Sequence, residues 1–203
     1  IEGVFLIDLA TFVFAVAMIL VVRIPNPAAQ SGAEAAEPSL LRQAAFGWRY
    51  VWARKGLLGM VTIFAIVNFA LGLYSALFVP LVLSRFGSET LGGLFSLSGL
   101  AMLGGSMAMS AWGGAKRRIH SMVGGLCVAG IGMAIAGLRP DVFLIGAGNL
   151  LLFASTPFAN ASSQAIWLAK VPSDVQGRVF AIRMMIAWCT TPLAYLLAGP
   201  LAD

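Results

Sequence analysis

Long apolar runs separated by short polar segments make up most of this sequence. The runs of sufficient length cover residues 3–22, 56–84, 90–112, 121–138, 142–169 and 179–198. Because roughly 20 helical residues span the ~30 Å hydrocarbon core of a bilayer, each run predicts one transmembrane helix. We therefore expect an all-α membrane protein, built as a polytopic bundle of about six transmembrane helices.

The segment 23–55 between the first two runs follows a different pattern. It begins with small, polar and weakly acidic residues, which are typical of a flexible linker. An amphipathic helix pattern follows, in which Trp48 and Trp52 share one face while Arg42 and Arg49 point away from it. This pattern predicts a helix that lies on the membrane surface with Trp at headgroup depth, or one that packs against the bundle.

Positive charge alternates from loop to loop along the chain. The segment 23–55 and the loops 113–120 and 170–178 hold most of the Lys and Arg residues, whereas Arg85 and Arg139 each have an acid nearby. Because positively charged loops resist translocation, the first three segments are predicted to be cytoplasmic. The predicted parts are a transmembrane helix at 1–22, a cytoplasmic linker with a surface helix at 23–55 and a transmembrane bundle at 56–203.

The composition favours lipid as the solvent for most of the chain. Hydrophobic residues make up 60% of the sequence and charged residues 10%, against about 25% charged in a soluble domain. The mean hydropathy is +0.91. The net charge of +5 lies in a few loops and is not interleaved with stacking aromatic residues, which argues against nucleic acid as a partner.

Motifs for bond-making chemistry are absent from the sequence. It contains neither His-Glu-x-x-His nor Gly-x-Ser-x-Gly, and no phosphate-binding Gly-x-x-x-x-Gly-Lys. Cys127 and Cys189 lie in separate apolar runs without a second ligand at metal-binding spacing. We therefore expect no enzyme activity, no metal site and no cofactor.

Asp8 is the one carboxylate placed well inside an apolar run. A carboxylate in lipid either finds a partner or takes up a proton, because desolvation favours its neutral form. Asp8 is therefore a candidate for proton coupling. The alternatives are a structural hydrogen bond to a neighbouring helix and a position near the outer interface.

Four amide side chains lie inside the predicted spans and are candidates for lining a substrate pathway. They are Asn68, Asn149, Asn160 and Gln164. The last two are four residues apart and share one helix face. Amides in apolar spans either line a wet cavity or bond neighbouring helices together, and the sequence leaves both roles open.

Both ends of the chain lie in or next to apolar sequence. It begins at Ile1 without an initiator Met and ends at Asp203, directly after the last span. The first run lacks the charged leader and the small-residue cleavage site of a signal peptide. We therefore expect a fragment of a longer membrane protein.

Three stretches carry a resemblance to a known family. Residues 5–12 read Phe-Leu-Ile-Asp-Leu-Ala-Thr-Phe, residues 113–118 read Gly-Gly-Ala-Lys-Arg-Arg, and residues 171–181 read Val-Pro-Ser-Asp-Val-Gln-Gly-Arg-Val-Phe-Ala. Together they resemble the second half of a Major Facilitator Superfamily transporter. The similar branch is that of drug and siderophore exporters, which includes macrolide efflux proteins and the enterobactin exporter. The acidic residue usual in the family's basic loop is absent from 113–118.

The resemblance implies a partial major facilitator fold in a bacterial inner (plasma) membrane. The chain would supply helices six to eleven, with the N-terminal half and helix twelve missing. Five residues at the cytoplasmic helix ends would hold one conformer, and we call them the latch: Lys116, Arg117, Arg118, Gly177 and Arg178.

The resemblance also implies secondary active transport by alternating access. Protons and a small lipophilic molecule, such as a drug, a macrolide or a siderophore, would be the partners besides the lipid bilayer. The hypothesis from a different class is a membrane-embedded scaffold or sensor that uses the same bundle without transport.

Overall fold

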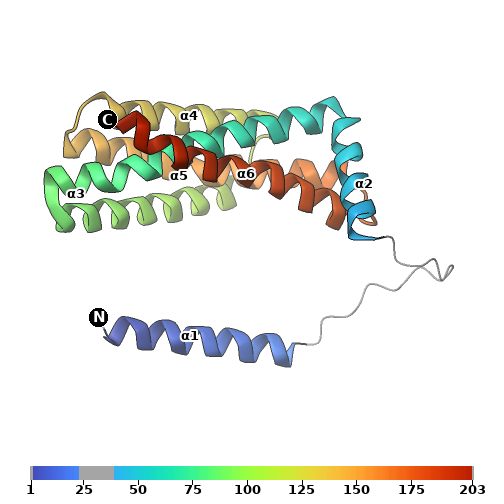
Figure 1. Cartoon of the computed structure of the whole chain (residues 1–203), viewed down its shortest axis with the longest axis horizontal. Helices are drawn as coiled ribbons and strands as arrows, with labels where there is room; N and C mark the ends of the chain where they lie inside the picture. Colours follow the sequence, from blue (N-terminus) through green and yellow to red (C-terminus); the bar gives the residue numbers. More distant parts are fainter. Residues whose placement is uncertain (1, 23–38, 203) are drawn as a thin grey trace. The chain divides into compact units, whose positions relative to one another are not determined.

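The computed structural model describes residues 2–22 and 39–202 and divides the chain into two units, Ile1–Glu37 and Pro38–Asp203. All regular structure in the described ranges is helical, which confirms the predicted all-α class. The helices are α1 (Glu2–Val21), α2 (Leu40–Trp52), α3 (Lys55–Trp112), α4 (Arg118–Leu138), α5 (Val142–Lys170) and α6 (Gln176–Ala202) (Figure 1). We describe α1 by itself and call α2–α6 the bundle.

The 58-residue helix α3 contains two of the predicted spans. A straight helix of this length would measure about 87 Å, nearly three times the ~30 Å hydrocarbon core. Gly87 interrupts it with φ 85° and ψ 177°, a conformation that glycine adopts readily because it has no Cβ. The chain reverses at this residue, so the two halves of α3 run antiparallel (Figure 1). The break between the predicted spans 56–84 and 90–112 is therefore made by one non-helical residue.

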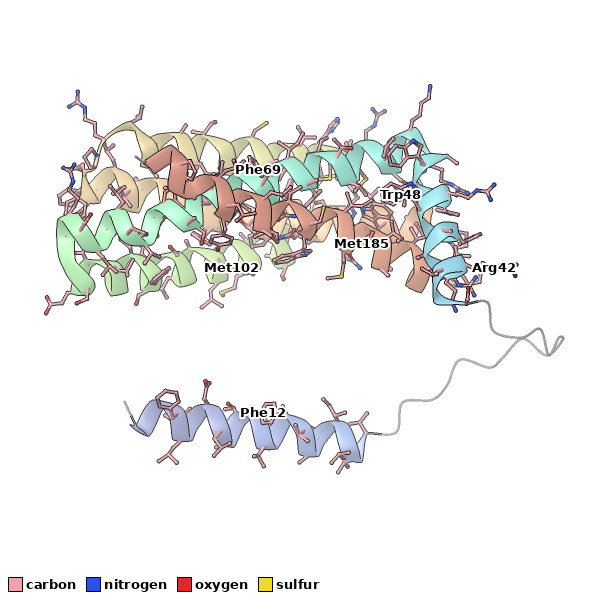
Figure 2. All side chains as sticks on the ribbon, in the orientation of Figure 1. Phe12, Arg42, Trp48, Phe69, Met102 and Met185 are labelled. Atoms are coloured by element: carbon pink, nitrogen blue, oxygen red, sulfur yellow. The ribbon has the colours of Figure 1, made fainter. Side chains whose placement is uncertain are left out.

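Four helices of the bundle, α3–α6, are long and apolar enough to cross a membrane, and α1 contributes a shorter apolar stretch, Phe5–Val21. The six predicted runs correspond to α1, the two halves of α3, and α4, α5 and α6. Large apolar side chains cover their outer surface, among them Met102 and Met185 (Figure 2). Contiguous apolar surface on this scale is unfavourable in water and suits a lipid environment.

Small residues allow α4 and α5 to pack closely. The pair Gly132 and Ala136 is buried against α5, and a Cβ added to Gly132 would lie 2.6 Å from the carbonyl oxygen of Gly148. The two backbones are therefore in direct contact, as small-residue stripes permit in lipid. The neighbouring pair with the same spacing, Gly130 and Ala134, is exposed. Of these two stripes of small residues on α4, only the one formed by Gly132 and Ala136 contacts α5.

Two clusters of buried apolar side chains hold the bundle together. The larger one joins residues from α2 to α6, namely Val51, Leu57, Met60, Val61, Met122, Trp167, Val171 and Val179. The smaller one joins the two halves of α3 to α5 through Phe78, Val82, Leu94 and Ile145. Between these clusters α3 and α6 approach closely at Gly72. A Cβ on Gly72 would lie 2.8 Å from that of Ala194.

The helix α2 lies across the end of the bundle at which α6 begins (Figure 1). Its inner face packs on α6: Val51 is fully buried, and a Cβ on Gly47 would lie 2.7 Å from the carbonyl oxygen of Arg178. Trp48 and Trp52 remain exposed on another face and stack with ring centroids 5.0 Å apart. The helix thus packs against the bundle and still presents an aromatic face outward.

Candidate functional site

Two of the four predicted pathway amides border the same pocket. Asn68 on α3 and Asn160 on α5 line a space of about 190 Å³, whose remaining walls are mostly apolar side chains of α3, α4 and α5. Among the described residues, nothing hydrogen-bonds the side chain of Asn160, which is exposed. Its donor and acceptor are therefore available to a bound molecule.

Asn68 also joins two helices. Its Nδ2 donates a 2.9 Å hydrogen bond to the backbone oxygen of Ala187 on α6. In the opposite direction, the hydroxyl of Thr190 on α6 donates a 2.9 Å bond to the backbone oxygen of Ala65 on α3. Reciprocal bonds of this kind fix the register of two helices in lipid. Thr190 was not a predicted site residue, and its hydroxyl within an apolar span was the only available signal.

Asn149 lies at a different place in the bundle. It is 1% exposed, and its Oδ1 accepts a hydrogen bond from the hydroxyl of Tyr74 on α3. The two side chains border a second pocket of about 250 Å³, together with Ser75 and Ser98. Asn149 therefore bonds a neighbouring helix and borders a pocket, and its part in a substrate pathway stays a prediction.

Gln164 is held by a residue that the sequence did not single out as a site. The Nη1 of Arg183 on α6 donates a 2.7 Å hydrogen bond to the Oε1 of Gln164, and its Nη2 lies 3.3 Å from the hydroxyl of Ser163. The guanidinium also lies over two aromatic rings, 5.2 Å from the centroid of Trp167 and 5.9 Å from that of Phe180.

The described partners of Arg183 are all neutral. A charged group within a membrane-spanning helix is costly and commonly has a functional role. The sequence carried a signal for it, because Arg183 is a charge that follows the start of the last apolar run.

The first three latch residues lie where α3 leads into α4, with Lys116 and Arg117 in the loop 113–117 and Arg118 at the first position of α4. Arg118 is part of the loop's own structure, since its Nη1 donates a 2.8 Å hydrogen bond to the backbone oxygen of Gly113. Lys116 and Arg117 are exposed and have no partner within the described part of the chain. Two of the three cations are therefore available to a group outside the described structure.

The other two latch residues lie where α2 meets α6. The guanidinium carbon of Arg178 is 5.9 Å from the ring centroid of Phe46 on α2, within the range of a cation–π contact. Gly177 and Arg178 border an open groove of about 330 Å³ between the two helices. The five latch residues therefore occupy two separate places in the bundle.

Asp8 lies on α1, where it is exposed within its own unit. Its backbone oxygen accepts a 2.9 Å hydrogen bond from the hydroxyl of Thr11. No contact of its carboxylate is described, so its part in proton coupling stays a prediction. Across residues 2–22 and 39–202, no group of three or more His, Cys, Asp or Glu residues could hold a metal ion.

Long apolar helices, an apolar exterior and amide-bordered internal pockets define a polytopic helical membrane protein. The sequence matches the Major Facilitator Superfamily over residues 1–194. The chain therefore belongs to this superfamily, whose members are membrane transporters rather than enzymes. It is a multi-pass protein of the bacterial inner (plasma) membrane.

The curated relatives reported for this chain share the same name. The chain is 24% identical over 201 residues to Macrolide efflux protein A of Streptococcus pyogenes, covering 97% of this chain and 49% of that protein. It is 24% identical over 191 residues to Macrolide efflux protein A of Enterococcus faecalis, covering 92% of this chain and 58% of that protein. The chain thus spans about half the length of the curated relatives it matches. Among solved structures there is no significant match.

Proposed function

We propose that this chain forms the second half of a secondary transporter that exports a small lipophilic molecule. The observation that carries the proposal is the alignment of nearly the whole chain, 97% and 92% of it, with two macrolide efflux proteins. The proposed cargo is a macrolide, another drug of similar character, or a siderophore.

The pocket between Asn68 and Asn160 supports this cargo class. Its walls are mainly apolar, and its few polar groups are neutral amides, which suit a lipophilic molecule with scattered hydrogen-bonding groups. At about 190 Å³ it is smaller than the ~300–1,000 Å³ typical of sites for drug-sized ligands. We therefore propose that the N-terminal half supplies the rest of the cavity.

In alternating access, the proposed role of the latch is to stabilise one of the two conformers. Lys116 and Arg117 are exposed cations with no partner in the described residues, and Arg178 lies at the start of α6 beside α2. Contacts of such cations with carbonyl or carboxylate groups of the other half would stabilise one conformer by a few kcal/mol. Binding of cargo or of a proton would then shift the population toward the other conformer.

Asp8 is the proposed site of proton coupling. Protonation would remove the charge that makes this side chain unfavourable in the hydrocarbon core, so the neutral helix could change its surroundings. An Asp8→Asn variant should lose transport against a gradient but retain transport down a gradient. Unchanged uphill export by this variant would contradict the coupling role.

The experiment that tests the exporter function is drug accumulation in cells that express the full-length protein. We expect cells with the protein to hold less of a fluorescent macrolide than cells without it. Asn160→Leu should raise the cargo concentration for half-maximal export about fivefold, as expected for one lost hydrogen bond of ~1 kcal/mol. The control is Ala161→Leu, which introduces the same leucine side chain at an exposed neighbour that does not border the pocket.

The alternative function is a membrane-embedded scaffold or sensor built on the same bundle. It predicts equal macrolide accumulation with and without the protein. That outcome, obtained with protein shown to be folded and inserted, would reject the exporter.

A further inference from the structure

An open apolar groove of about 460 Å³ lies between the end of α3, the first half of α4 and the middle of α5. Trp112 and Phe158 form one wall, with ring centroids 6.1 Å apart. Gly124 and Val128 of α4 also line it. A Cβ added to Gly124 would have no heavy atom within 4 Å, so the space above this glycine is open. The groove is thus open above Gly124, although α4 and α5 pack closely at the neighbouring Gly125, where a Cβ would lie 3.0 Å from the backbone nitrogen of Ala159.

One end of the groove opens at the basic loop between α3 and α4. Ala115 and His120 line this end. The loop is held there by a 2.7 Å hydrogen bond from the backbone nitrogen of Ala115 to the hydroxyl of Ser121. Lys116 and Arg117, which lie between Ala115 and His120, are exposed and have no partner in the described residues.

An apolar groove that ends at Ala115, in a loop that also carries the exposed cations Lys116 and Arg117, matches the polarity of a phospholipid with a negative headgroup. We propose that this groove binds an anionic phospholipid, with an acyl chain along Trp112, Gly124 and Val128 and its phosphate at Lys116 and Arg117. The site is separate from the pocket that Asn68 and Asn160 border, and it does not depend on which molecule is exported.

Three observations favour a membrane lipid over another occupant. The groove lies on helices long and apolar enough to span a membrane, so lipid is the molecule present there at the highest concentration. Its lining is nearly all apolar, with few groups to orient a polar cargo. Each basic residue near the membrane surface raises the affinity for anionic lipid about fivefold, the equivalent of ~1 kcal/mol. Arg118 is excluded from this count because it bonds the oxygen of Gly113.

The test uses Trp112 as a reporter inside the groove. The purified full-length protein is reconstituted in phosphatidylcholine bilayers that contain increasing amounts of brominated phosphatidylglycerol or brominated phosphatidylcholine, which quench tryptophan on contact. The Trp112 signal is the difference between the protein and a Trp112→Phe variant, which keeps an aromatic wall. We expect the anionic lipid to quench Trp112 at a mole fraction several-fold lower than the zwitterionic lipid does.

Two pairs of variants separate the site from the general lipid surroundings. Replacing Lys116 and Arg117 together by Gln should abolish the preference for phosphatidylglycerol, whereas replacing Arg42 and Arg49 together by Gln, on α2, should preserve it. Gly124→Leu fills the groove and should also abolish the preference. Gly137→Leu, at an equally open glycine near the far end of α4, should leave it unchanged.

Three results would overturn the proposal. They are equal quenching by the two lipids in the unaltered protein, a preference that survives the Lys116 and Arg117 replacements, and a preference that survives Gly124→Leu. Protection of Trp112 from both brominated lipids by a macrolide would assign the groove to cargo and would likewise reject a lipid site.

Discussion

The guanidinium of Arg183 on α6 donates a 2.7 Å hydrogen bond to the amide oxygen of Gln164 on α5. Side chains, rather than closely packed backbones, join the two helices here, since Trp167 and Phe180 also meet edge to face with centroids 6.2 Å apart. The bond gives one N–H of the Arg183 guanidinium a neutral acceptor inside a membrane-spanning helix. The stability of the α5–α6 contact should therefore depend on it.

Gln164→Leu removes the amide oxygen and leaves the Arg183 guanidinium with one acceptor fewer. We expect the free energy of unfolding to fall by about 1 kcal/mol, between the ~0.6 kcal/mol average for polar contacts in membranes and the ~1.5–3 kcal/mol of bonds to charged groups. Unfolding in mixed detergent micelles measures the change. Met184→Leu, at an exposed neighbour of Arg183, is the control, and equal stability of the two variants would contradict the prediction.

The Tyr74–Asn149 bond joins α3 to α5, with Asn149 fully buried and Tyr74 half-buried. Tyr74→Phe removes the donor, and Asn149→Leu removes the acceptor. In a double-mutant cycle we expect a coupling free energy of about 0.6 kcal/mol, and no more than about 1.7 kcal/mol, because the unfolded helices in a membrane also find polar partners. Additive losses in the double variant would mean that the pair contributes no coupling.

The α4–α5 contact should tolerate no added side chain at Gly132. Gly132→Ala places a Cβ 2.6 Å from the carbonyl oxygen of Gly148, and overpacking of this kind costs about 1–3 kcal/mol. Gly137→Ala, on the same helix with open space around it, should be neutral or raise stability by up to ~1 kcal/mol through helix propensity. Thermal denaturation of the purified variants measures both changes in stability. Similar melting temperatures for the two variants would contradict close packing at Gly132.

The loops should alternate between the two sides of the membrane. In the bundle, the reversal at Gly87 and the start of α6 lie at opposite ends (Figure 1). In a background without Cys127 and Cys189, Ser88→Cys should react with a membrane-impermeant maleimide from outside intact cells. Lys116→Cys should react only after permeabilisation. Labelling of both positions from one side would refute the alternation.

The latch hypothesis predicts a kinetic effect at Arg178. Arg178→Ala removes the cation beside Phe46 and should lower the rate of export several-fold while leaving cargo affinity nearly unchanged, because the residue acts on the balance between conformers. Transport rates and KM in proteoliposomes provide the measurement, with Arg49→Ala on the exposed side of α2 as the control. A large loss of affinity at an unchanged rate would reject the latch role.

Helix spans were predictable because their cause is local. Backbone groups in lipid must bond within their own segment, so the length of an apolar run determines that a helix forms and where it crosses. The two halves of α3 follow this rule, and Gly87 falls between the predicted runs 56–84 and 90–112. The amphipathic pattern of α2 likewise identified the exposed Trp48 and Trp52 face, but it did not indicate the Gly47 face that packs on α6.

Contacts between helices were not predictable because they depend on rotation about each helix axis. Two stripes of small residues on α4 have the same spacing, yet Gly132 is buried against α5 while Gly130 is exposed. Asn68 and Asn149 have similar surroundings in the sequence, but one bonds a backbone oxygen of α6 and the other the hydroxyl of Tyr74.

The sequence by itself determined that this is an all-helical membrane protein, how many times it can cross the bilayer and which polar side chains lie within the spans. The tertiary structure decided which of those side chains meet. It joined Gln164 to Arg183, brought Asn68 and Asn160 to one pocket and opened an apolar groove beside Lys116 and Arg117. The physical reason is that spans arise from the hydropathy of neighbouring residues, whereas contacts arise from packing between segments far apart in the chain.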